Sequence, residues 1–438
     1  MTELYTHFIH QTSHELANLL LATLDAERLE QVQYADQEAK AILRQVGQQA
    51  MRLVFATLAE RVTAEAQAEG FTVERRPSIR VDTLFGAIEI ESPYVWRTGE
   101  GHRPVKERLK VSHATRTPAV ERALADFGAE ESFAQASVRF AEHYGFCVGA
   151  STVGRVVTSV AREAAEYLAE KLTAAEVEYE RARAGRHGVA ELLAELDGCE
   201  IRTVQCQTIR DGATQKIISR MRELEWREVR VGLAGRLGSA TRTYVARLGS
   251  YAEIGRDLFR AAIIEGLSPA TKVIGVADGG QGLREELALQ FPRLQFILDK
   301  SHVVGHLYET AEALAYDGRR REQWVTRKVA QLSAGGVKKV LRELRRKAQS
   351  CERAGRLRAY LERFQDALCY DRFKAAGYPV GSGEVESAHR YIPQKRLKIA
   401  GASWKVETVN QMLALRLIRA NGWWAEFWQQ RQAQFLAA

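Results

Sequence analysis

Three acidic residues stand in sequence settings that could place them around metal ions. Asp197 (ELLAELDG) and Asp278 (TKVIGVADGG) each follow a short apolar run and precede glycine, which predicts a carboxylate at the C-terminal end of a buried strand. Glu386 (VGSGEVESAHR) lies just inside a helix that we predict to begin after a glycine-serine-glycine turn. Oxygen ligands from separate elements are what a site for two hard divalent cations needs. Each Asp-Gly pair alone is more typical of a turn, so the prediction depends on all three residues together.

A fourth acidic residue, Asp299, follows another apolar run (LQFILDKSHVVGH), and His302 and His306 come after it. The two histidines would share a helix face, which suits a metal pair, a phosphate contact or a hydrogen bond to a catalytic carboxylate. Asp299 could equally cap the helix, with the histidines as polar residues at the edge of the core. The sequence supports both interpretations.

Glu384 and Glu386 are alternative candidates for the third ligand. In a helix, residues two apart point roughly 200° away from one another, so only one of them can face the ions. The apolar stripe of Val385, Ala388 and Ile392 defines the buried side of this helix. Glu384 is explained by the preference for acids at the positive end of a helix, so we expect Glu386 to be the ligand.

Length and composition predict a soluble protein of several domains. A chain of 438 residues, 46% hydrophobic and 27% charged, predicts two to four domains. It has neither an apolar run near the ~18 residues of a membrane span nor the layout of a signal peptide, so we expect a cytoplasmic protein without a membrane partner. The five cysteines are scattered and form no CxxC pair, so neither structural disulfides nor zinc are expected.

Positive charge is concentrated near the predicted third ligand. The formal net charge is +8, and the segment from Ser387 to the end carries eight Lys or Arg residues against two Glu. A second basic stretch runs from Arg319 to Lys347. Cations beside a carboxylate cluster fit a phosphodiester substrate. The cations that we expect to position a DNA strand are Arg390, Lys395, Arg396 and Lys398.

Periodicity along the chain predicts a multidomain α+β protein. Residues 1–70 indicate helices, and residues 71–98 alternate with a period of two, as in a small sheet or hairpin. Further on, LLAELDGCEIRTVQ predicts two strands joined by a turn, WREVRVGLAGRL predicts a third, and strands and helices then alternate. This order is that of a ribonuclease-H-like fold, in which the first and fourth strands are neighbours and would carry Asp197 and Asp278.

A helix-turn-helix is predicted before this α/β region. In SFAQASVRFAEHYGFCVGASTVGRVV, Gly145 ends a first helix and Ser151 can cap a second. Thr152 and Arg155 of the second helix could reach a DNA groove. Helix pairs with a glycine turn are also common in all-α proteins, so the motif alone does not establish DNA binding.

Two blocks of the sequence resemble a known family. VADGGQGLREELALQFPRLQFILDKSHVVGHL and VGSGEVESAHRYIPQKRLKIAGASWKVETVNQMLALRLIRANGWWAEFW are similar to bacterial insertion-sequence transposases of the Kra type, which belong to the DDE transposases. The similarity extends to the FGAIEIESPYVWR hairpin, the helix-turn-helix and ELDG. Relatives often have paired cysteines after the hairpin, whereas this chain has RTGEGH at 97–102. A zinc knuckle is therefore not expected.

The resemblance implies an enzyme that cleaves and joins DNA strands. It assigns Asp197, Asp278 and Glu386 as catalytic residues that bind two Mg²⁺ (or Mn²⁺) ions, with Asp299 and His302 as an accessory pair. It also implies a homo-oligomer that binds double-stranded DNA, both the element's terminal inverted repeats and the target. The expected segments are 1–75 (N-terminal helical region), 76–117 (small β-hairpin and loop), 118–182 (helix-turn-helix region), 187–310 (first part of the ribonuclease-H-like catalytic domain), 311–377 (helical insertion) and 378–438 (C-terminal helices with a basic, tryptophan-rich tail).

Two other functions are compatible with the same residues. One is a catalytically silent repressor derived from a transposase, although all three acids are present. The other is a ribonuclease-H-like nuclease of recombination or repair. Short inverted repeats flanking the gene, with direct target duplications outside them, would distinguish a transposase from both.

The charge distribution leads to a first prediction. DNA binding by the full-length protein should weaken steeply as salt concentration rises, because the two basic stretches would release counterions from the phosphates that they neutralise. The measurement is the logarithm of affinity against the logarithm of salt concentration. A flat line would mean that these cations face solvent or another subunit.

Overall fold

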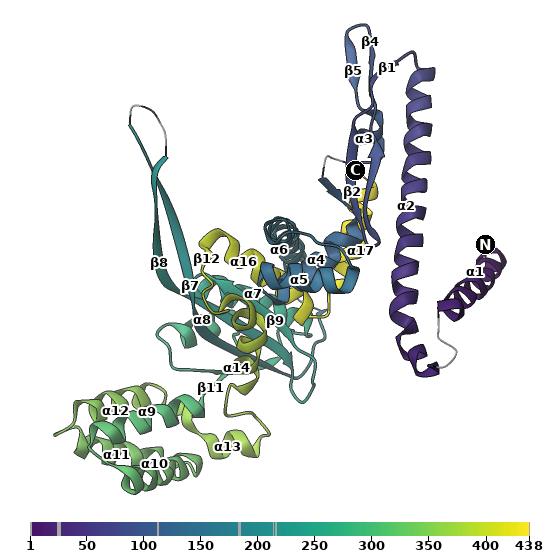
Figure 1. Ribbon diagram of the computed structural model, residues 1–438. Coiled ribbons are helices and arrows are strands. Elements are labelled where there is room, and N and C mark those ends of the chain that lie inside the picture. The colour runs from purple at the N-terminus through teal and green to yellow at the C-terminus, as the bar shows by residue number, and fades with distance from the viewer. Residues whose placement is uncertain are drawn as a thin grey trace. The chain divides into compact units, whose positions relative to one another are not determined.

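A computed structural model describes residues 2–23, 28–111, 114–182, 185–212, 214 and 217–437 (Figure 1). The chain divides into two compact units. The first comprises residues 1–128 and 133–157, and the second comprises residues 129–132 and 158–438. No helix in the described ranges combines the length and apolarity that a bilayer span requires.

The first unit contains helices, as the N-terminal pattern predicted, and two small sheets where the sequence predicted one small sheet or hairpin. The sheets have the strand orders β3-β2-β6 and β1-β4-β5, and alternate residues such as Val81, Ile88 and Ile90 are buried against α2. The elements are α1 (Thr2–Thr23), η1 (Leu29–Tyr34), α2 (Ala35–Ala68), β1 (Thr72–Arg75), β2 (Ser78–Thr83), β3 (Gly86–Glu91), β4 (Tyr94–Arg97), β5 (Glu100–His102), α3 (Pro104–Arg108), β6 (Ala114–Arg116), α4 (Pro118–Glu130) and α5 (Phe133–Tyr144).

A glycine turn separates α5 from α6 (Ala150–Ala182), where the sequence predicted a helix pair. Gly145 adopts a φ of +70°, a left-handed conformation that ends α5 at low cost. Arg155 is exposed on α6, whereas Thr152 is half-buried. At 33 residues, α6 is far longer than the second helix of a short helix-turn-helix and continues into the second unit.

The second unit is built on a mixed sheet with the strand order β11-β10-β7-β8-β9, and β12 also pairs with β7. β8 is antiparallel to both β7 and β9, whereas β10 is parallel to β7 and β11. The predicted adjacency of the strands that lead to Asp197 and Asp278 is therefore confirmed. The strands are β7 (Glu191–Arg210), β8 (Ile217–Arg236), β9 (Thr243–Leu248), β10 (Lys272–Ala277), β11 (Leu294–Leu298) and β12 (Trp404–Lys405).

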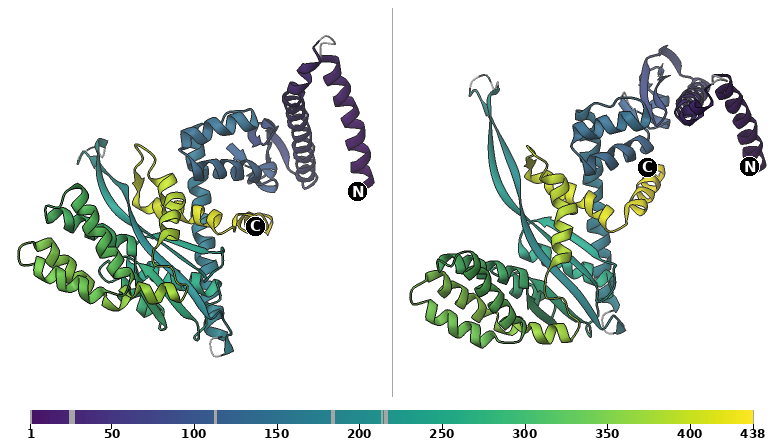
Figure 2. Two further views of the ribbon diagram at one scale, coloured as in Figure 1. Left: turned by 90° about the horizontal axis from the view of Figure 1, so that it is seen from below. Right: turned by 60° about the horizontal axis from the view of Figure 1, so that its bottom comes forward.

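The prediction of two strands joined by a turn at Asp197–Gly198 is wrong. β7 runs through both residues as one strand of 20 residues, and Asp197 and Gly198 pair with Val231 and Arg230 of β8. The continuous antiparallel partner, β8, forms hydrogen bonds with the backbone N–H and C=O groups that a turn would have removed from the sheet. Beyond the buried part of the sheet, β7 and β8 extend as a two-stranded ribbon (Figures 1 and 2).

Helices cover this sheet and return the chain to it. A helical segment lies between α9 and α14, as the sequence predicted, and Figure 2 shows it as one bundle beside the sheet. The helices are α7 (Tyr251–Ile264), α8 (Leu283–Gln290), α9 (Lys300–Ala313), α10 (Gly318–Ser333), α11 (Val337–Lys347), α12 (Glu352–Arg363), η3 (Gln365–Leu368), α13 (Tyr370–Ala375), α14 (Gly383–His389), the π turn η4 (Arg390–Gln394), α15 (Lys395–Leu397), α16 (Val406–Ala420) and α17 (Trp424–Ala437).

Candidate metal centre

The register between β7 and β10 sets Asp197 beside Asp278. Leu196 pairs with Ala277 in the last parallel pair between the two strands, and each aspartate is the next residue along the chain. Asp278 follows the end of β10, as predicted. Asp197 instead lies within β7, at the point where the buried part of the strand gives way to partly exposed residues.

Each aspartate is oriented by the backbone that follows it. Asp197 Oδ1 accepts a hydrogen bond of 2.8 Å from the amide of Gly198, and Asp278 Oδ1 accepts one of 2.9 Å from that of Gly280. Fixing one oxygen in this way leaves Oδ2 of each carboxylate directed away from the local backbone. Burial raises the pKa of Asp197, and the charge of Asp278 raises it further.

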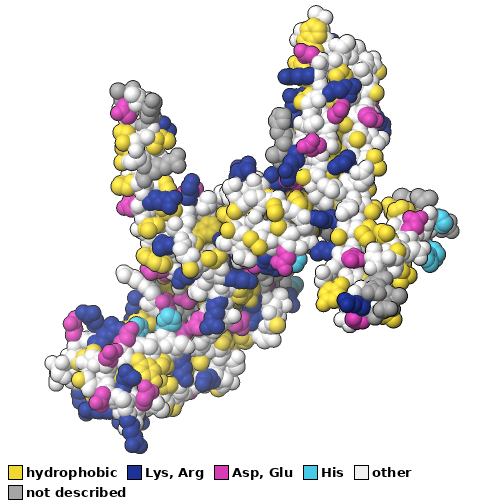
Figure 3. Space-filling model, viewed as in Figure 1, with side chains coloured by type: hydrophobic (Ala, Val, Ile, Leu, Met, Phe, Trp, Pro, Cys, Tyr) yellow, Lys and Arg dark blue, Asp and Glu magenta, His cyan; other side chains and the backbone are white. Residues whose placement is uncertain are grey.

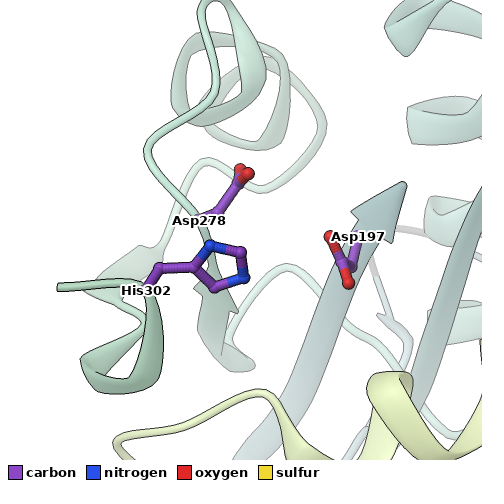
Figure 4. A group of neighbouring side chains, drawn as sticks. All are labelled: Asp197, Asp278 and His302. Atoms are coloured by element: carbon purple, nitrogen blue, oxygen red, sulfur yellow. The ribbon is translucent and has the colours of Figure 1, made fainter. Parts of the chain in front are cut away.

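His302 brings the third side chain to this pair. It lies in the first turn of α9, and its ring has a nitrogen within 4.8 Å of carboxylate oxygens of both Asp197 and Asp278. The three side chains extend from separate elements into a common space (Figure 4). His306, one turn later, lies outside this group and contacts Glu309 at 3.1 Å.

Glu386 reaches the same region from α14. One of its oxygens lies within 4.8 Å of ligand atoms of both Asp299 and His302. Among the described residues, the three predicted catalytic acids do not form a single group at this distance. They belong to two groups, one with both aspartates and one with Glu386, and His302 is common to both. The exposed carboxylate of Glu386 retains access to solvent.

Glu384 points elsewhere, as the helix geometry predicted. Its two oxygens accept hydrogen bonds from Arg242, of 2.5 Å from Nε and 2.8 Å from Nη2. Val385 and Ala388 form the buried side of α14. The arrangement therefore leaves Glu386, and not Glu384, beside His302 and Asp299.

Asp299 connects α9 to α14. Its carboxylate is fully buried and accepts hydrogen bonds from the amides of Ser301 (2.5 Å) and His302 (3.3 Å) at the start of α9. Its other oxygen accepts one of 2.9 Å from the amide of Ser382, whose hydroxyl also donates to it. Both oxygens are thus used, which matches the helix-cap interpretation and makes Asp299 a positioning residue.

Glu195 supports the same helix and was not predicted from the sequence. It is 1% exposed, two residues before Asp197 on β7, and its Oε2 accepts a hydrogen bond of 2.8 Å from the amide of Val385. Burial raises the pKa of Glu195 to about 8. The hydrogen bond from Val385 lowers the pKa, but its effect is weaker than that of burial. Residues two apart on a strand lie on the same side, so Glu195 shares a side with Asp197. This spacing is the sequence signal that could have identified Glu195.

Another neighbour of Asp197 is His389, which is buried at the end of α14. Its Nε2 lies 3.6 Å from Asp197 Oδ2, beyond the length of a hydrogen bond. Burial lowers the pKa of His389 to about 4, so the ring is neutral at pH 7 and the contact is not an ion pair. The imidazole therefore contributes packing beside Asp197 instead of positive charge.

The four predicted DNA-positioning cations have different surroundings. Arg390 and Lys398 are exposed, and Lys395 is exposed but pairs with Glu130 at 2.6 Å. The prediction for Arg396 does not hold, because its side chain is only 3% exposed and its guanidinium lies over the ring of Trp404, 4.7 Å from the centroid. Spacing along a helix could not reveal this, because β12 carries the tryptophan back against α15.

The helical segment also contacts the loop that carries Asp278. A Cβ added at Gly279 would lie 2.4 Å from the ring of Tyr360, a residue of α12. No side chain fits at this position, which explains a glycine directly after the aspartate. Burial raises the pKa of Tyr360 to about 12, and the nearby charge of Asp278 adds to this effect.

Comparison with known proteins identifies one family. The model of the Uncharacterised protein family (UPF0236) matches residues 31–432. No curated protein matches the chain. The matched range includes every residue of the candidate metal centre.

The buried carboxyl of Glu195 makes stability depend on pH. In the folded protein the Glu195 carboxyl keeps its proton up to about pH 8, whereas in the unfolded chain its pKa has the ordinary value of 4.5. The stability that this difference contributes is therefore complete below about pH 4.5 and is lost as pH rises through 8. Relative to Glu195→Gln, the free energy of unfolding of the wild type should fall by about 1.4 kcal/mol per pH unit within this window.

Urea unfolding in metal-free buffer, followed by tryptophan fluorescence, measures this difference. All tryptophans except Trp96 lie in the second unit, so the signal reports on the part that contains Glu195. Glu200→Gln, at an exposed position of the same strand, is the control. Parallel pH profiles for the wild type and Glu195→Gln would show that the buried carboxyl does not keep its proton.

Proposed function

The chain belongs to the uncharacterised protein family UPF0236, and we propose that it is a DDE-type DNA transposase. The observation that carries the proposal is the convergence of acids around His302. Asp197 and Asp278 reach it from neighbouring strands, and Glu386 reaches it from α14. Carboxylates that converge from separate elements are suited to phosphodiester cleavage and strand transfer.

The sheet supports a ribonuclease-H-like catalytic domain. Three consecutive antiparallel strands, β7 to β9, are followed by two parallel ones, and the first strand is central beside the fourth. In such a sheet, a ligand site at the carboxyl ends of β10 and β11 agrees with the positions of Asp278 and Asp299. The helical segment between α9 and α14 would then be an insertion in this domain.

The donor set fits Mg²⁺ or Mn²⁺, because carboxylate oxygens predominate and the centre has no cysteine. Asp197, Asp278 and Glu386 would hold the ions, which supply Lewis-acid chemistry to an attacking hydroxyl and to the phosphodiester. Asp197 and Asp278 present one oxygen each because their own backbone holds the other. Asp299 and Glu195 fix the start of α14 and thereby the position of Glu386.

Double-stranded DNA is the partner that we propose. In the first unit, α5, its glycine turn and the start of α6 would read the terminal inverted repeats through residues such as Arg155. In the second unit, exposed Arg390 and Lys398 flank the metal centre and would hold a strand by its phosphates. A homo-oligomer follows from the reaction, since two DNA ends must be joined.

Removing either aspartate should separate catalysis from binding. Asp197→Ala and Asp278→Ala should each abolish Mg²⁺-dependent cleavage of duplex DNA that carries the ends flanking the gene, because each removes an ion ligand. Affinity for the same duplex should remain nearly unchanged, because phosphate contacts elsewhere supply it. Cleavage by either variant within about tenfold of the wild type would exclude the two-metal mechanism.

The two glutamates of α14 offer a matched pair. Glu386→Gln should lose Mg²⁺-dependent cleavage, since a neutral amide is a poor ligand for a hard cation. Glu384→Gln should retain most activity, because it alters only a partly exposed ion pair with Arg242. The same cleavage assay compares both variants, and the reverse order of activities would place the third ligand at Glu384.

A further inference from the structure

Helix α11 of the helical segment has one strongly basic face. Val337, Val340 and Leu344 are buried in the segment's core. At 100° per residue, the exposed cations fall within an arc of about 120° and extend over about 12 Å of the helix axis. These cations, here called the α11 basic face, are Lys338, Lys339, Arg342, Arg345 and Arg346. Lys and Arg side chains also gather over the lower edge of this segment in Figure 3.

The α11 basic face lacks the neutralising partners that other cations of the segment have. The single acid of α11, Glu343, points toward α10, where it accepts a hydrogen bond of 2.8 Å from Trp324 Nε1 and pairs with the buried Lys328. No carboxylate among the described residues forms an ion pair with a cation of the α11 basic face.

The neighbouring helix α12 provides the contrast. Arg356 pairs with Glu352 at 2.5 Å, Arg358 with Glu362 at 3.7 Å, and Arg363 with Glu285 of α8 at 2.8 Å. Like charges three and four residues apart destabilise a helix when nothing compensates them. The α11 basic face therefore costs the fold some stability, unlike the paired surface of α12.

We propose that the α11 basic face binds the phosphate backbone of duplex DNA. A duplex carries one negative charge per ~1.7 Å of its axis, counting both strands, so a length of about 12 Å carries roughly seven charges, part of which face a helix on one side. Contacts of this kind add affinity and orient the duplex but do not read sequence. The inference rests on the proposed function, because DNA is the substrate proposed there.

The surroundings of α11 favour DNA over a membrane surface. A helix that binds a bilayer exposes large apolar side chains beside its cations. Here the apolar side of α11 is packed into the segment, and no residue between 290 and 434 is an exposed large hydrophobic. The only strong surface feature of the helix is its charge, which complements a polyanion.

A matched pair of triple variants of the full-length protein tests the proposal. Lys338→Gln, Arg342→Gln and Arg345→Gln together remove three charges from the α11 basic face. Arg356→Gln, Arg358→Gln and Arg363→Gln together remove three paired charges from α12. Affinity for a random-sequence duplex of about 30 base pairs is measured by fluorescence anisotropy against salt concentration, with EDTA present to prevent cleavage. Far-UV circular dichroism checks that both variants fold.

The α11 variant should reduce the slope of log affinity against log salt by about 0.9 for each phosphate that is no longer neutralised, or up to about 2.7 in total. The α12 variant should leave the slope close to that of the wild type. Equal slopes for the two variants would overturn the proposal. A second outcome would also overturn it: the wild type binds vesicles of one-third phosphatidylserine and the α11 variant does not, while the two proteins bind DNA equally.

The result is independent of catalysis. If the wild type does not cleave DNA but the α11 variant shows the reduced slope, the transposase function fails while the DNA-binding surface stands. If cleavage is normal and the slope is unchanged in the α11 variant, the surface fails while the function stands.

Discussion

The buried carboxylate of Asp299 is the interaction on which the candidate metal centre depends. It lies at the end of β11 and joins the first turn of α9 to the residue before α14, 83 positions later in the sequence. A fully buried charge is costly unless hydrogen bonds satisfy it, and four donors do so here. His302 and Glu386 both lie on helices whose starts Asp299 holds, so this side chain ties their positions together, and Glu195 adds a second hold on α14.

The helical segment can be understood from the same constraint. The chain leaves the sheet at α9 and returns at Val380, whose carbonyl accepts a hydrogen bond of 2.9 Å from the amide of Lys300. What lies between these points does not have to take part in the sheet. The segment nevertheless contacts the centre through Tyr360, which packs over Gly279. A change in this bundle could therefore reach the loop of Asp278 directly.

Local sequence patterns were sufficient for much of the fold. The apolar runs before Asp278 and Asp299 identified two strand ends, and the apolar stripe of α14 distinguished Glu386 from Glu384, because these features depend on only a few neighbouring residues. The path of β7 through Asp197 could not be read in this way, since it depends on pairing with a strand some 30 residues away. β9 was missed because TYVARL is short and only partly buried.

Burial of polar side chains was the least predictable feature of the site. Glu195, His389 and Arg396 are polar or charged residues in segments that could equally have faced solvent. Elements outside their own strand or helix cover two of them: α14, about 190 residues later, covers Glu195, and Trp404 of β12 covers Arg396. A pattern of charge alone therefore overestimated the basic surface near α14. It assigned one cation of four, Arg396, to the wrong environment.

The pairing of β12 with β7 bears on how the protein is made. Residues 404–405 add to a strand that begins more than 200 residues earlier, and Ser382 and Val385 supply the hydrogen bonds that Asp299 and Glu195 need. While the ribosome is still translating the segment before residue 382, Asp299 lacks the donors of Ser382, Glu195 lacks the amide of Val385, and Glu386 does not yet exist. Assembly of the centre is thus a late event in synthesis, and a prematurely terminated chain would carry both aspartates without the helix that completes the site.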